Sequence, residues 1–144
     1  MKILHFIPLL FLFFSQCHSL ANQSVFFTKE GVIRGYDPVS YFQNQPVKGK
    51  RSISLQYKGG TWFFASENNK LLFEKNPEKF SPQYGGFCAY AMRDGNKYEI
   101  DPLAWTMHGG KLYLNISKKV NGFWQRNLEE NIQKSDRQWD KLQQ

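Results

Sequence analysis

The sequence predicts an α+β fold, a small single domain of two β-hairpin-plus-helix units with small antiparallel sheets and a C-terminal helix. Two stretches of alternating apolar residues each turn at a pair of glycines, Gly59-Gly60 and Gly109-Gly110, which can supply the positive φ angles of a tight hairpin. A serine, Ser66 or Ser117, then precedes a helical pattern that it can cap. No low-complexity linker separates the units, so we expect one domain over residues 31–142.

The first unit is predicted to open with a short helix over residues 36–42. Asp37 can accept hydrogen bonds from the free amides of the first turn, and Pro38 suits the first helical position. The hairpin and helix that follow are expected over residues 53–57, 61–65 and 67–76.

The second unit repeats this order of motifs. Asp101-Pro102 echoes Asp37-Pro38, and residues 108–114 echo residues 58–64. Apolar residues four apart then predict a long amphipathic helix; they are Val120, Trp124, Leu128 and Ile132. Ser135 begins a capping-box pattern, which predicts a last short helix that carries Trp139 and Leu142.

The N-terminal residues 1–21 have the pattern of a secretory signal peptide. Lys2 is followed by an apolar run, and small residues stand at Ser19 and Ala21. The run is much shorter than the roughly 20 residues of a membrane-spanning helix, so we expect no transmembrane segment. We expect Sec-type export, cleavage after Ala21, a short leader over residues 22–30 and a periplasmic or secreted protein.

The positive charge does not indicate a nucleic-acid partner. The formal net charge is +7, but the lysines are scattered along the chain and the densest pair is Lys118-Lys119. Nucleic-acid-binding proteins concentrate basic residues in a run or on one face. We therefore predict a solvated basic surface and no nucleic-acid partner.

Removal of residues 1–21 would leave one cysteine and one histidine, Cys88 and His108. One cysteine and one histidine are too few for an internal disulfide, for a zinc site of four cysteines or of two cysteines and two histidines, and for a blue-copper site within one chain. Lipid attachment at Cys17 is the alternative to cleavage after Ala21, although Gln16 is unusual before a lipidated cysteine.

The stretch 84–92 holds the candidate metal ligands. Gly85 and Gly86 allow a tight turn, and Cys88 and Met92 lie four residues apart, which places both sulfurs on one face of a helix or strand. Thiolate and thioether are soft ligands that suit Cu(I), and Met107 and His108 are further candidates. Such a site would need a metal donor or acceptor protein of the envelope, a second copy or a small thiol to complete it. The alternative is structural: a buried cysteine and a methionine that fills a gap.

Two other classes of function stay open, and the sequence leaves the oligomeric state open as well. A thiol enzyme would pair Cys88 with His108, oriented by Asp37 or Asp101, but no nucleophile motif surrounds Cys88 and both aspartates suit capping. We therefore expect a non-enzymatic protein. An interaction module would instead bind a small organic ligand or a peptide in an aromatic groove, with Tyr36, Tyr41, Trp62, Tyr84, Tyr90 and Trp105 as its candidate lining.

Three runs of residues, 35–42, 57–66 and 73–80, resemble the YHS domain. The first reads Gly-Tyr-Asp-Pro-Val-Ser-Tyr-Phe. Residues 82–89 and 110–115 are similar to the exported bacterial proteins built around that domain, so the resemblance covers nearly all of residues 31–142. Metal-associated YHS domains are small folds of metal-transporting ATPases, metal sensors and some monooxygenase subunits, which implies metal binding through cysteines.

The sequence departs from the metal-binding form of that domain. Its cysteine positions carry Ser40, Ala65 and Asn69 here, and none of these replaces a thiolate. Cys88 belongs instead to the Tyr-Gly-Gly-x-Cys-Ala element of the exported proteins. We therefore expect an exported, non-enzymatic YHS-domain protein that captures Cu(I) reversibly through Cys88 with Met92.

Overall fold

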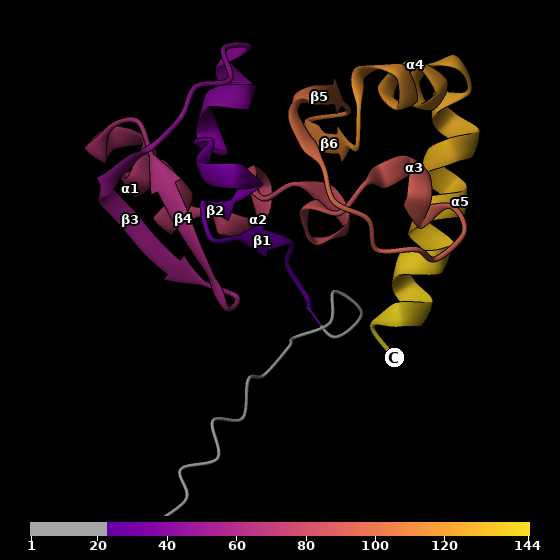
Figure 1. Cartoon of the computed structure of the whole chain (residues 1–144), viewed down its shortest axis with the longest axis horizontal. Coiled ribbons are helices and arrows are strands. Elements are labelled where there is room, and N and C mark those ends of the chain that lie inside the picture. The colour runs from indigo at the N-terminus through magenta and orange to yellow at the C-terminus, as the bar shows by residue number, and fades with distance from the viewer. Residues whose placement is uncertain (1–22) are drawn as a thin grey trace, which may run out of the picture.

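The computed structural model describes residues 23–144. The predicted signal peptide, 1–21, and Cys17 lie outside the described residues. Figure 1 shows two halves side by side, with the first hairpin in one and the second hairpin and the C-terminal helices in the other. Each hairpin is a separate two-stranded antiparallel sheet, and no helix among residues 23–144 is long and apolar enough to cross a membrane. The α+β class, the small antiparallel sheets and the C-terminal helix are confirmed.

The two hairpins have the same internal geometry. Strands β3 (Lys50–Tyr57) and β4 (Gly60–Phe64) form the first, and β5 (Asp101–His108) and β6 (Lys111–Asn115) form the second. Tyr57 pairs with Gly60 and His108 pairs with Lys111. In each hairpin the register shifts within the first four residues of the first strand, between Lys50 and Ser54 and between Asp101 and Trp105. This pairing equates Tyr57 with His108, so it is one residue out of step with the sequence echo, which aligns Lys58 with His108.

The first hairpin turns one residue earlier than predicted. Lys58 and Gly59 occupy the turn with φ of 48° and 79°, whereas Gly60 already belongs to β4. The second turn is Gly109-Gly110 as predicted, with φ of 58° and 71°. The sequence did not reveal the difference, because Lys58 is not a residue type that favours a positive φ.

The Asp-Pro motifs share a local contact but not an element. Asp37 precedes the short 3-10 helix η3 (Val39–Gln43), as predicted, whereas Asp101 begins strand β5. In both motifs the carboxylate accepts a bond from the amide two residues later, Val39 N at 2.8 Å and Leu103 N at 2.9 Å.

Serine caps begin the principal helix of each unit. Helix α1 (Glu67–Lys75) is capped by Ser66, and α4 (Lys118–Arg126) is capped by Ser117, each accepting from the amide three residues later. The connecting segment contains the short helices α2 (Pro77–Phe80), η4 (Gln83–Gly86) and α3 (Ala89–Met92).

The prediction of a helix beginning at Ser135 is wrong. The helix is interrupted at Asn127 instead, and α5 (Leu128–Leu142) is continuous through Ser135. Asn131 Nδ2 donates to Trp124 O at 2.8 Å, which satisfies a free carbonyl at the end of α4. Ser135 is fully buried and donates to Ala89 O at 2.9 Å, so it joins α5 to α3 rather than capping a helix.

One aromatic core runs through both halves. Trp62 and Phe73 pack with ring centroids 4.8 Å apart in the first half, and Tyr113 and Trp124 pack at 5.2 Å in the second. The N-terminal hairpin of β1 (Phe27–Thr28) and β2 (Gly31–Val32), with η2 (Ile33–Gly35), adds to this core. Val25 and Phe26, predicted to belong to a leader, are 5% and 3% exposed and pack into the domain.

Candidate functional site

Cys88 lies inside the core, immediately before α3. It is 1% exposed, and its Sγ donates to Asn115 Oδ1 at 3.6 Å. The same amide oxygen accepts from Tyr90 N at 2.9 Å. Burial raises the pKa of the Cys88 thiol, because apolar surroundings disfavour the thiolate. This environment favours a protonated thiol.

Met92 lies one helical turn after Cys88, whereas the other two candidate ligands, Met107 and His108, lie in β5 near the tip of the second hairpin. Met92 ends α3, is fully buried, and its amide donates to Cys88 O at 3.1 Å. His108 lies at the tip of the second hairpin, where its Nε2 is 2.8 Å from Glu129 Oε1. Met107 precedes it in β5 and pairs with Leu112. Asn115, the partner of Cys88, lies four residues along β6 from the tip, about 13 Å away at the rise of a strand.

Among residues 23–144 no group of three or more histidine, cysteine and acidic side chains could hold a metal ion. A soft-metal site within one chain would therefore depend on Cys88 and Met92. The thiol would have to lose its proton and its contact with Asn115 before it could bind a metal.

The three positions at which the resemblance to metal-type YHS domains would place cysteine all contact the buried Asp37, two through its carboxylate and one through its backbone carbonyl. Ala65 N and Asn69 Nδ2 donate to Asp37 Oδ2 at 2.8 and 2.7 Å, and Ser40 Oγ donates to Asp37 O at 2.6 Å. Asp37 is fully buried, and its other oxygen accepts from Val39 N. A hydrogen-bond network fills this place, and the residues present do not fit a metal.

The six aromatic residues predicted to line a groove do not surround one cavity, although the rings of Tyr41 and Trp105 pack 5.8 Å apart. Tyr41 is fully buried and donates to Pro102 O, and the buried Tyr84 donates to Asp136 Oδ1. Tyr90 stacks under the Arg93 guanidinium, 4.6 Å from the ring centre. Trp62 alone of the six lines the cavity described next.

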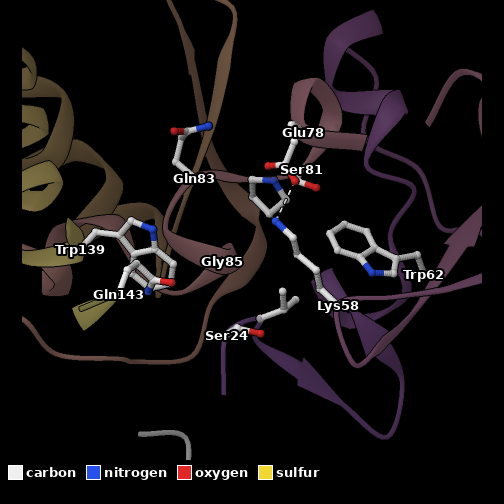
Figure 2. Close-up of a pocket in the computed structure, with 11 residues that line it drawn as sticks. Ser24, Lys58, Trp62, Glu78, Ser81, Gln83, Gly85, Trp139 and Gln143 are labelled. Carbon is white, nitrogen blue, oxygen red and sulfur yellow. Dashed lines mark hydrogen bonds and ion pairs between the residues drawn. The ribbon is translucent and has the colours of Figure 1, made fainter. Parts of the chain in front are cut away.

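A cavity of about 310 Å³ lies where the two halves and the N-terminal segment meet. Figure 2 shows Trp139 of α5 and Gln143, which follows that helix, on one side and Lys58, Trp62 and Glu78 on the other. Its lining comes from four separate parts of the chain: Ser24, Val25, Lys58, Trp62, Glu78, Ser81, Pro82, Gln83, Gly85, Trp139 and Gln143. The volume is at the lower end of the range of about 300–1,000 Å³ typical of small-molecule sites.

A charged pair lies at the edge of this cavity. Lys58 Nζ and Tyr57 Oη both donate to Glu78 Oε1, at 2.7 and 2.6 Å. The bond from Lys58, followed by that from Tyr57, lowers the pKa of Glu78, and Glu78 in turn raises the pKa of Lys58. Both groups are therefore charged near neutral pH, and together they add no net charge to the cavity.

Sequence reasoning missed most of this site. Trp139 was predicted only as part of the C-terminal helix, and Lys58 only as a residue near the turn. The early turn places Lys58 beside Glu78, which lies 20 residues further along the chain. Contacts between segments this far apart leave no periodic signal in the sequence, so local patterns could not have revealed the cavity.

The fold defines a small α+β protein of two hairpin-helix units with a cavity between its halves. Residues 37–84 match the family model of the YHS domain. This part of the chain is similar to the YHS domain, and the matched segment spans η3, the first hairpin, α1, α2 and part of η4. No curated protein and no solved structure matches the chain.

Proposed function

We propose that this YHS-domain protein is a non-enzymatic binding protein that holds a small molecule in the cavity between its halves. The supporting observation is the composition of that cavity: the indoles of Trp62 and Trp139 form apolar walls, and the Lys58–Glu78 pair and glutamine side chains add polar groups. Apolar walls with a few convergent polar groups are typical of ligand sites. Export to the periplasm or beyond is part of the proposal and is supported by residues 1–21 of the sequence.

A non-enzymatic role is supported by the state of Cys88. A nucleophilic cysteine needs a thiolate and access to its substrate, whereas this thiol is buried and its pKa is raised. His108, the general base considered from the sequence, is paired with Glu129 at the far end of the hairpin.

The proposal is tested by screening a library of small polar and aromatic compounds with ligand-observed NMR. Compounds that bind are then measured by calorimetry against Gln143→Ala, a cavity variant at the residue that follows α5, and Gln133→Ala, an exposed position within α5. We expect weaker binding only for Gln143→Ala. No hit, or hits that bind both variants as tightly as the parent protein, would overturn the proposal.

A soft-metal site for Cu(I) is the second candidate function, because Cys88 immediately precedes α3 and Met92 ends it, and both residues are buried in the same core. In this case a donor or acceptor protein, a second copy or a small thiol would supply further ligands; Met107 and His108 could contribute only from a second copy. The test is a Cu(I) titration against a chromophoric chelator, with Cys88→Ala beside the parent protein. Tight stoichiometric binding that Cys88→Ala abolishes would support the site, and equal weak binding would end the hypothesis.

A further inference from the structure

The cavity offers both hydrogen-bond donors and acceptors to a ligand. Lys58 Nζ can donate, and the amides of Gln83 and Gln143 can both donate and accept. Both bonds to the Glu78 carboxylate use Oε1, so Oε2 remains as an acceptor. These groups come from the turn before β4, the connecting segment and the residue that follows α5, so they approach a ligand from different sides (Figure 2).

The charges in the cavity favour a neutral ligand. An anion would meet the Glu78 carboxylate, and a cation would meet the Lys58 ammonium, because the two groups are 2.7 Å apart. A purely apolar ligand would remove water from this charged pair without replacing its hydrogen bonds, which is costly. A neutral ligand with many hydroxyl groups can bond both Lys58 and Oε2 of Glu78 while their ion pair stays intact.

The aromatic wall adds a requirement for an apolar face. Trp139 is half-buried; its ring packs edge-on against Tyr84 at 6.3 Å and, in Figure 2, borders the cavity opposite Lys58. The face of a pyranose ring presents C–H groups that pack on an indole, and its edge presents hydroxyl groups. The volume of about 310 Å³ suits a small ligand rather than an extended chain.

We infer that the ligand of this cavity is a neutral saccharide of one or two rings, with a ring face on Trp139 and hydroxyl groups on Lys58, Glu78 and Gln143. This inference rests on the proposed function, since it names the chemical class of the ligand for the same cavity. The competing class is a zwitterion such as a free amino acid, whose two charges would replace the Lys58–Glu78 pair rather than preserve it.

The test compares a panel of neutral mono- and disaccharides with a panel of free amino acids, by saturation-transfer NMR and calorimetry. We expect saccharides to bind, with affinity about three- to tenfold weaker in Gln143→Ala and Lys58→Met, as for the loss of one hydrogen bond. Gln133→Ala and Lys119→Met, exposed positions outside the cavity, serve as matched controls and should bind like the parent protein. Thermal melting of every variant separates lost binding from lost folding.

The outcomes distinguish this inference from the proposed function. Binding of amino acids or other compounds but not saccharides, weakened by Gln143→Ala, overturns the saccharide inference and leaves the cavity as the binding site. Saccharide binding that every cavity variant retains places the ligand elsewhere and overturns both. Absence of binding by any compound in either panel and in the wider library also overturns both.

Discussion

At the residue scale, two aspartates in equivalent motifs have different roles. Asp37 is fully buried and accepts from Val39 N, Ala65 N and Asn69 Nδ2, and the last two reach it from residues 28 and 32 positions away. Asp101 is half-buried and accepts from Leu103 N. The sequence predicted the local capping bond of Asp37 but not the distant ones, because nothing in a capping motif shows what its second oxygen contacts.

This difference predicts unequal losses of stability. Asp37→Ala leaves three donors without their acceptor, so we expect it to lower the free energy of unfolding by about 3 kcal/mol or more. Asp101→Ala removes one exposed bond from a strand amide and should cost only about 1 kcal/mol. Urea unfolding followed by circular dichroism measures both values, and equal losses would show that the Asp37 network does not stabilise the fold.

Cys88 predicts a pH dependence of stability. Burial raises the pKa of its thiol in the folded protein, so the unfolded chain, with a pKa of about 8.5, loses the proton first. The folded state then binds more protons than the unfolded state, and the free energy of unfolding falls as pH rises above about 8.5. This one group can contribute at most about 1.4 kcal/mol for each pH unit.

Cys88→Ala is the control for this dependence. Between about pH 8.5 and 10 the variant should lose less stability than the parent protein, measured by urea unfolding in matched buffers. The window ends near pH 10 because unfolded tyrosines then begin to ionise, and burial also raises the pKa of Tyr41, Tyr84 and Tyr113. Parallel curves for the two proteins would contradict a buried, protonated thiol.

At the scale of elements, local sequence patterns predicted which segments form strands and helices but not how these elements pack against one another. Alternation and paired glycines identified both hairpins, and serines identified the starts of α1 and α4. The four-residue apolar stripe continues across Asn127, so periodicity could not reveal the break between α4 and α5. Asn131 supports that break by reaching back to the end of α4, a contact that depends on how the two helices pack.

The helix break therefore predicts a specific effect of Asn131→Ala. The change removes the side-chain donor of Trp124 O, a buried carbonyl at the end of α4. It should therefore lower the free energy of unfolding by about 1–3 kcal/mol. Gln133→Ala, two residues away on the exposed face of α5, should change it by less than about 0.5 kcal/mol. Chemical unfolding of both variants measures the difference, and a cost for Asn131→Ala as small as that of the control would contradict its capping role.

At the scale of the whole molecule, the N-terminal segment closes the junction between the halves. Phe26 N donates to Gly85 O at 2.8 Å, and Ser24, Val25 and Gly85 all line the cavity. A Cβ on Gly85 would lie 2.1 Å from Ser24 O and 3.2 Å from the Trp139 ring. Glycine at this position therefore lets the segment before β1, the connecting segment and α5 approach one another.

A comparison of Gly85→Ala with Gly59→Ala separates the effect of this close approach on stability from the effect of backbone strain. Both glycines have a positive φ, 62° and 79°, so alanine should cost about 1 kcal/mol of strain at either position. Only at position 85 does the methyl group meet backbone, because nothing lies within 4 Å of a Cβ at Gly59. We expect Gly85→Ala to lose at least about 2 kcal/mol and to increase proteolysis before residue 30, since the N-terminal segment must move away. Thermal melting and limited proteolysis with mass spectrometry measure the two effects. If both variants behaved alike, strain alone would explain the glycine, and the two halves would not depend on the N-terminal segment for their contact.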